Sequence, residues 1–202
     1  MRRLVTLSLS FFVILVLLAG CSSTKQATKS TSPNTDTGVK ATSTGSGTYT
    51  ASFGDIQITL TLPATEDATV QAIKAFSSKA EALKPSNQTP ITLASFTVKN
   101  GSSNSTRCEM YTFSLTFNTG NQVDGKQASE VVGNIQNAIP SSDESGLYNE
   151  GVDLYNKLIE PTDIMPGTSR TSYCVFQVAD LAGLKKVFAS YYSAGTKEMK
   201  KQ

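Results

Sequence analysis

The sequence of 202 residues contains no histidine and no tryptophan. The missing histidine excludes Ser-His-Asp and Cys-His catalytic arrangements, and it excludes every zinc site that uses imidazole. An excess of one charge sign is also missing, because 18 Lys and Arg against 16 Asp and Glu leave a net charge of +2. Domains that bind nucleic acid usually carry a clear basic excess, so this balance argues against a nucleic-acid partner.

The first 21 residues have the three parts of a secretory signal. Arg2 and Arg3 precede an apolar segment at residues 4–19, and small residues then precede a cysteine. The tetrapeptide Leu18-Ala19-Gly20-Cys21 resembles the lipobox of bacterial lipoproteins. This resemblance implies a signal peptide at residues 1–20, a diacylglyceryl group on the Cys21 sulfur, and an extracytoplasmic protein anchored to the cell membrane. Two acyl chains give stable anchoring, whereas one chain binds a bilayer only marginally.

An uncleaved transmembrane helix and a signal cleaved elsewhere are the alternatives. The apolar segment spans 16 residues, which is short of the roughly 20 that a bilayer requires. Cleavage before Cys21 removes Arg2 and Arg3 and lowers the count of Lys and Arg from 18 to 16, against 16 acids. The mature protein is therefore formally neutral.

Residues 21–48 combine the lipidated Cys21 with a tether rich in Ser, Thr and Gly. Val39 is the one sizeable apolar residue in this tether, so the segment cannot bury enough surface to offset its ordering entropy. We expect a disordered spacer with a typical reach of about 30 Å. A glycosylated or ligand-binding low-complexity tract is the alternative interpretation.

The folded domain is expected at residues 49–195, followed by a charged, frayed tail at 196–202. Apolar residues alternate at 56–62 and at 111–117, which predicts strands. Helical spacing predicts a helix over 66–84, with Thr65 as its N-cap and Pro85 at its end. The pattern at 127–160 fits strand or helix for its first half and is loosely helical in its second.

Three smaller features complete the expected elements. The apolar phase changes between Leu93 and Phe96, which predicts a β-bulge near Ala94-Ser95. A polar loop is expected at 118–125, and a helical turn at 180–186. Strands are expected near 173–178 and finally at 187–192, the former after a Pro166-Gly167 turn.

Cys108 and Cys174 form an even pair in an exported chain, which predicts a disulfide. The bond would close a long loop and stabilise the fold by about 4 kcal/mol in the chain-entropy treatment. Two buried free thiols are the alternative, because cysteine also packs as a small hydrophobe. A metal site is not expected, since two thiols without histidine supply too few soft ligands.

Short alternating strands separated by turns predict an immunoglobulin-like antiparallel β-sandwich with helical insertions, a mainly β fold. The absent tryptophan, and Ser172 where the corner tyrosine would stand, argue against a true immunoglobulin domain. Four segments carry a closer resemblance: Phe96-Thr97-Val98-Lys99-Asn100-Gly101, Tyr111-Thr112-Phe113-Ser114-Leu115, Asp124-Gly125, and Met165-Pro166-Gly167 leading to Cys174-Val175-Phe176-Gln177-Val178. With them, the chain resembles telokin-like, immunoglobulin-fold domains of unknown function on bacterial cell-surface lipoproteins, chiefly Gram-positive ones. That family carries no assigned catalytic residues.

Few residues point to chemistry. Asp143-Glu144 and the pair Glu150 and Asp153 could serve as paired carboxylates, although such pairs usually form a solvated helix face. No calcium-loop or phosphate-loop spacing is present, so neither metal nor cofactor is expected.

We therefore expect a non-enzymatic, lipid-anchored binding or interaction module. Its membrane contact is the lipid anchor, and its further partner is a protein or an envelope ligand. The loops Gly101–Arg107 and Asn118–Gly125 are the expected contact elements, because loops on rigid sandwiches often carry recognition. The alternatives are a cell-envelope enzyme or enzyme accessory that uses carboxylates, and a structural envelope lipoprotein.

Overall fold

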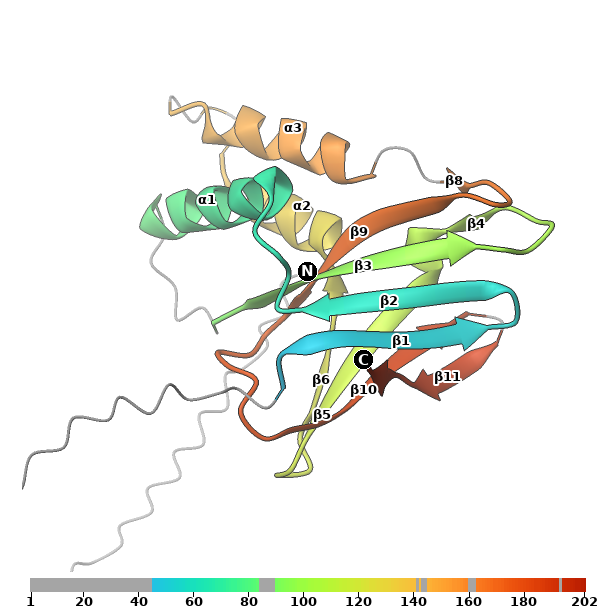
Figure 1. Cartoon of the computed structure of the whole chain (residues 1–202). Helices are drawn as coiled ribbons and strands as arrows, with labels where there is room; N and C mark the ends of the chain where they lie inside the picture. Colours follow the sequence, from blue (N-terminus) through green and yellow to red (C-terminus); the bar gives the residue numbers. More distant parts are fainter. Residues whose placement is uncertain (1–44, 84–89, 141, 143–144, 160–162, 193) are drawn as a thin grey trace, which may run out of the picture. The chain divides into compact units, whose positions relative to one another are not determined.

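The computed structural model describes residues 45–83, 90–140, 142, 145–159, 163–192 and 194–202 (Figure 1). The predicted signal, Cys21 and almost all of the tether lie outside the described residues. The fold is mainly β, with antiparallel sheets and three α-helices in the described part. None of the helices described is long and apolar enough to cross a membrane.

The larger sheet has six strands, and every neighbouring pair in it is antiparallel. In spatial order its strands are β12 (Lys200–Lys201), β1 (Gly47–Phe53), β2 (Ile56–Leu62), β3 (Thr92–Asn100), β9 (Ser169–Phe176) and β7 (Lys126–Gln127). β1, β2 and β3 follow one another in the chain and in the sheet. Both edges of the sheet are therefore strands of only two residues.

A second sheet has four strands, and a third has two. The four are β11 (Gly195–Glu198), β10 (Leu184–Tyr191), β5 (Tyr111–Phe117) and β6 (Gln122–Asp124). The two-stranded sheet pairs β4 (Thr106–Arg107) with β8 (Asp163–Ile164). A short 3-10 helix, η1 (Cys108–Met110), joins β4 to β5.

One apolar core contains side chains from both of the larger sheets. Because side chains alternate along a strand, β2 places Ile58 and Leu60 together on one face, and both are fully buried. The Phe96 ring on β3 lies 4.8 Å from the Phe113 ring on β5. Residues of the two sheets thus belong to a single packed cluster.

A second core lies between the helices and the other face of β3 and β9. The helices are α1 (Ala68–Leu83), α2 (Ala128–Ala138) and α3 (Leu147–Ile159), and they stand together beside the β3–β9 part of the sheet (Figure 1). Leu93 and Val175 face these helices and pack with Phe76. A side chain at Gly151 would place its Cβ 2.8 Å from the Phe76 Cζ atom, so glycine allows α3 to approach α1.

The structure confirms the strands predicted at 56–62 and 111–117 and the turn at Pro166-Gly167. It also confirms a helix in the segment 66–84, although α1 begins at Ala68. The predicted cap is wrong: the Val70 amide donates to Asp67 Oδ1 at 2.8 Å, so Asp67 caps the helix instead of Thr65. The segment 127–160, whose first half fitted either strand or helix, contains the helices α2 and α3. Pro85 lies outside the described residues.

The predicted bulge near Ala94-Ser95 is also wrong. β3 pairs with β9 without interruption from Thr92 to Lys99. The apolar phase changes because Leu93 faces the helices, whereas Ala94 and Phe96 face the core shared by the sheets. A strand buried on both faces produces this pattern without any irregular backbone.

The C-terminal part is more ordered than the sequence pattern suggests. The segment expected as a frayed tail at 196–202 contains most of β11 and all of β12, so that prediction is wrong. β10 is consequently not the final strand. It begins at Leu184, and the residues before it form a turn where a helical turn was expected. The loop expected at 118–125 includes the short strand β6.

Candidate functional site

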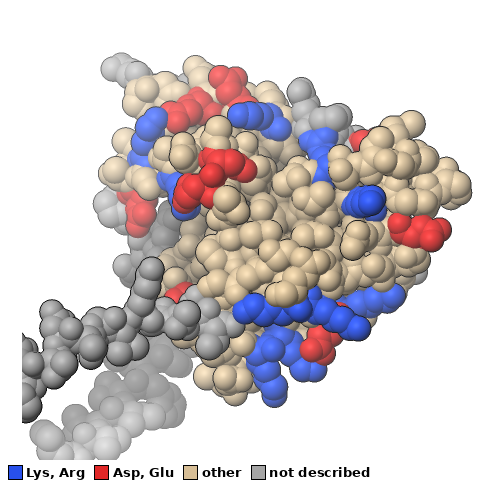
Figure 2. Space-filling view, in the orientation of Figure 1, with Lys and Arg blue, Asp and Glu red and all other residues tan. Residues whose placement is uncertain are grey.

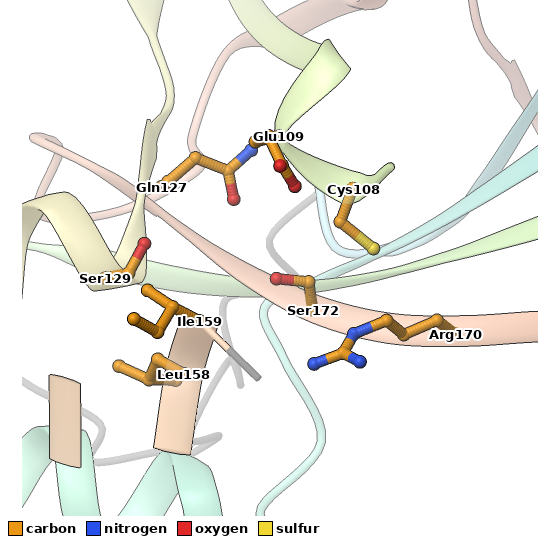
Figure 3. A pocket seen from close by; sticks show the side chains of 8 residues that line it. All are labelled: Cys108, Glu109, Gln127, Ser129, Leu158, Ile159, Arg170 and Ser172. Atoms are coloured by element: carbon orange, nitrogen blue, oxygen red, sulfur yellow. The ribbon is translucent and has the colours of Figure 1, made fainter. Parts of the chain in front are cut away.

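A cavity of about 250 Å³ opens beside β9 (Figure 3). We call it the Arg170 cavity. Five elements surround it: η1, β7, α2, α3 and β9. Its lining residues are Cys108, Glu109, Gln127, Ser129, Leu158, Ile159, Arg170 and Ser172.

Strand geometry places the polar residues of β9 in this cavity. Arg170 and Ser172 are two positions apart, so their side chains leave the same face of the strand. β7 pairs with β9 on the outer side and brings Gln127 opposite Cys174. The Gln127 Nε2 atom donates to the Tyr111 carbonyl at 3.1 Å, and this bond holds the amide while leaving its side-chain oxygen able to accept.

The η1 wall is fixed by polar contacts on both sides. Arg107 Nε donates to Asp163 Oδ1 at 2.7 Å and ties β4 to β8. The hydroxyls of Thr106 and Tyr111 are hydrogen-bonded at 2.8 Å in the buried interior. Cys108 and Glu109 are therefore carried on a short segment that is anchored at both ends.

Arg170 is the distinctive residue of the cavity. Among the described residues its side chain makes neither an ion pair nor a hydrogen bond, and the residue is only partly exposed. The carboxylate of Glu109 lies 3.7 Å from Nη1 of Arg107 rather than on Arg170. Figure 3 shows Arg170 and Ser172 facing Leu158 and Ile159 across the cavity. The cavity therefore offers a cation and hydroxyl groups on one side and an apolar wall on the other.

Both cysteines of the domain are free, buried thiols in the structure. Burial raises the pKa of the Cys108 thiol to about 11, even though the nearby Arg170 guanidinium favours the thiolate. Burial also raises the pKa of Cys174. The two belong to the same core cluster, but the disulfide predicted from the sequence is not formed in this structure and stays a prediction for the exported protein.

The free thiols should react slowly with an alkylating reagent in the folded, pre-reduced protein. A thiol pKa of about 11 in place of 9.0 lowers the thiolate fraction near neutral pH roughly 100-fold, and only the thiolate attacks. Iodoacetamide labelling of the Cys21→Ala variant, followed by intact mass, should show slow modification before denaturation and two rapid additions after it. Rapid labelling of Cys108 in the folded protein would contradict this placement.

The same labelling assay tests the disulfide when the reductant is omitted. Two labelled thiols in the denatured, non-reduced protein would contradict a bond between Cys108 and Cys174. Absence of labelling until a reductant is added would support the bond.

The loops expected to make contacts do not come together. The turn after β3 and the hairpin between β5 and β6 lie at different ends of the domain (Figure 1). In the first loop, the buried Asn100 side chain donates to the carbonyls of Asn104 at 2.7 Å and Ile164 at 2.9 Å. Its Oδ1 atom accepts from the Ser102 amide at 3.0 Å and from the Ser102 hydroxyl at 2.7 Å. Asn100 thus organises this loop internally.

The candidate carboxylates do not line the Arg170 cavity. Glu150 on α3 forms an exposed ion pair with Lys79 at 2.8 Å. Asp153 is exposed on the same helix. Asp143-Glu144 lies outside the described residues. In the described part of the chain, no group of three or more Cys, Asp or Glu side chains could hold a metal ion.

No family model, curated protein or solved structure matches the chain. Function therefore has to be argued from the cavity and the surface. Sequence reasoning missed Arg170 because it alternates with Ser169 and Thr171 in a polar stretch, although its shared phase with Cys174 was a signal that it points inward.

Proposed function

We propose that this chain is a non-enzymatic, lipid-anchored binding module outside the cell membrane, with the Arg170 cavity as its ligand site. The lipobox resemblance at Cys21 supports the anchor. The observation that carries the binding site is the Arg170 guanidinium, which has no ion-pair partner among the described residues and faces a preformed cavity. Concave sites with an apolar wall and a few convergent polar groups are typical ligand sites.

The scaffold of this module is proposed to be an immunoglobulin-like β-sandwich in the broad architectural sense. The core that holds side chains of both larger sheets supports a face-to-face arrangement. The strand order differs from the immunoglobulin order, since β1, β2 and β3 are consecutive neighbours in one sheet. The resemblance to telokin-like lipoprotein domains therefore concerns the architecture rather than the connections.

The ligand of the Arg170 cavity is proposed to be a small carboxylate with an apolar part. A guanidinium group matches a carboxylate in planar, two-bond geometry. Leu158 and Ile159 supply an apolar contact, and the hydroxyls of Ser129 and Ser172 can donate to a carboxylate oxygen. A volume of about 250 Å³ limits the ligand to a small molecule or to the terminal residue of a peptide.

A charge-sensitive binding assay tests this proposal. The probe is 4-methylpentanoate, and its uncharged match is 4-methylpentanamide. Arg170→Gln should weaken binding of the acid about 10- to 100-fold, because a hydrogen bond to a charged group contributes about 1.5–3 kcal/mol. The amide should change little. Ligand titrations followed by NMR shifts of the cavity residues measure both.

Glu109→Gln should change the affinity for the acid in the opposite direction to Arg170→Gln. Removing Glu109, the one acidic side chain among the described lining residues, should tighten binding of the acid several-fold and leave the amide unchanged. Lys99→Gln is the matched control, since it removes a positive charge from the neighbouring strand outside the cavity lining. Equal affinities for acid and amide, or no shifts in the cavity with either, would contradict the carboxylate class.

A further inference from the structure

A basic surface follows the edge of the domain where the C-terminal strands lie. We call it the basic edge and define it by Lys186, Lys197, Lys200 and Lys201. Figure 2 shows Lys and Arg side chains gathered over β1, β11 and the C-terminal end of the chain. The four lysines of the basic edge and Glu198 together carry a side-chain charge of +3. Since the exported chain as a whole is formally neutral, this charge is a local asymmetry.

Three of the four lysines of the basic edge make contacts that hold their side chains in place. Lys197 lies over the Phe53 ring with its Nζ atom 5.2 Å from the centroid, and it donates to the Ser52 carbonyl at 2.7 Å. The Nζ atom of Lys201 lies 5.9 Å from the centre of the Tyr49 ring. Lys186 forms an ion pair with Glu198 at 2.6 Å. The ammonium groups of Lys197 and Lys201 thus lie over aromatic rings, and both residues are exposed at the surface.

The first strand of the domain, β1, lies at this same edge. β12 pairs with β1, with Lys201 opposite Tyr49 and Lys200 opposite Thr50. Gly47, the first residue of β1, has a φ of +150°, and a Cβ atom there would lie 2.6 Å from Lys201 Cε. The first strand of the described domain therefore begins directly beside Lys201.

We propose that the basic edge is a docking surface for an anionic phospholipid bilayer, the one to which the lipid anchor attaches the chain. This inference rests on the anchoring part of the proposed function. A tether that reaches about 30 Å keeps the domain within contact distance of the bilayer, at a high effective concentration. Each lysine near an anionic surface biases binding roughly fivefold. Docking would turn the basic edge toward the membrane and the helices α1–α3, on the opposite side of the domain, away from it.

The test uses the lipidated full chain in vesicles of phosphatidylcholine alone, or with about 30% phosphatidylglycerol as the anionic component. Amine acylation followed by peptide mass spectrometry reports the accessibility of each lysine. We expect Lys197, Lys200 and Lys201 to react about three- to tenfold more slowly on anionic vesicles, and Lys74 and Lys79 on α1 to be unaffected. Salt at about 0.5 M should abolish the difference because it screens charges beyond a few ångströms.

Charge variants supply the matched comparison. Lys186 should be protected on anionic vesicles like the other lysines of the basic edge, and the triple change K197Q/K200Q/K201Q should remove that protection. The triple change K74Q/K79Q/K157Q on the helices should keep the protection of the basic edge. Flotation of the protein with neutral vesicles tests the anchor separately.

The outcomes separate the two proposals. Flotation without protection on anionic vesicles would overturn the docking surface alone. Absence of flotation with neutral vesicles would overturn the anchor and the inference that rests on it. Stronger protection by soluble polyphosphate on neutral vesicles than by anionic lipid would overturn the bilayer as the partner and assign the edge to a polyanion.

Discussion

Cys21→Ala should move the protein from the membrane fraction to the soluble fraction of the cells that export it. The expected effect is close to complete, because two acyl chains give stable anchoring and the variant has no sulfur to carry them. Fractionation with detection of the protein measures the change, and incorporation of a labelled fatty acid should disappear with it. Even a basic edge that contacts the bilayer provides only weak, salt-sensitive attachment compared with the acyl chains.

Ser22→Ala is the matched control for this experiment. It changes the neighbouring residue and leaves the cysteine intact, so membrane attachment and fatty-acid labelling should both remain. Continued tight association of the Cys21→Ala variant, resistant to salt, would contradict the lipid anchor and favour an uncleaved apolar segment.

Asn100→Asp should lower the free energy of unfolding by about 3–5 kcal/mol at neutral pH. The Asn100 side chain is fully buried and donates two hydrogen bonds to the carbonyls of Asn104 and Ile164. A carboxylate oxygen in that position would face two carbonyl oxygens without any proton, and burying a charge there adds a desolvation cost. Denaturant unfolding measures the loss.

The deficit caused by Asn100→Asp should shrink as the pH falls. Burial and the facing carbonyls favour the protonated carboxyl, so the folded variant binds a proton more readily than its unfolded chain, and its stability decreases as pH rises. Asn121→Asp makes the same change at an exposed turn and should alter stability by less than about 0.5 kcal/mol. Similar losses for the two variants, or a loss from Asn100→Asp that does not depend on pH, would contradict this account.

The strands with clean alternation were predictable because each has one apolar face. β2 and β5 place every second residue in the core shared by the two sheets, so local sequence alone is sufficient. β3 was harder because it is buried on both faces, with Leu93 toward the helices and Phe96 toward the other sheet. Apolar residues on both faces of β3 give a sequence pattern that looks like the phase change of a β-bulge.

Features that depend on distant contacts could not be predicted from local patterns. The segment containing Lys197 and Lys201 has the sequence of a charged tail, but it forms strands because β11 pairs with β10 and β12 pairs with β1, far away in the sequence. The ammonium groups of the two lysines lie over the rings of Phe53 and Tyr49. The helical state of α2 depends on packing as well, since Val132 is buried among the helices. β-branched residues alone favour neither state strongly enough.

The candidate site also combines residues that the local sequence indicates with residues that only distant contacts bring into the site. Cys108 and Cys174 attract attention in any exported sequence, and the structure places both in one buried cluster. Arg170 gains meaning only when η1, α2 and α3 assemble around β9 and enclose it in a cavity. Its capacity to bind an anion depends on the absence of an acidic partner for its side chain among the described residues, and the sequence alone does not show which acids lie nearby.

The short edges of the six-stranded sheet bear on how densely such a protein can be displayed. β12 and β7 have two residues each, and three of those four residues are lysines. Long, flat, uncharged edge strands pair readily with strands of other molecules, whereas short and charged ones do not. Molecules confined to a membrane by a lipid meet one another far more often than molecules in free solution. Lys200 and Lys201 of the basic edge, together with Lys126 at the opposite edge of the sheet, therefore also keep crowded neighbours from pairing edge to edge into aggregates.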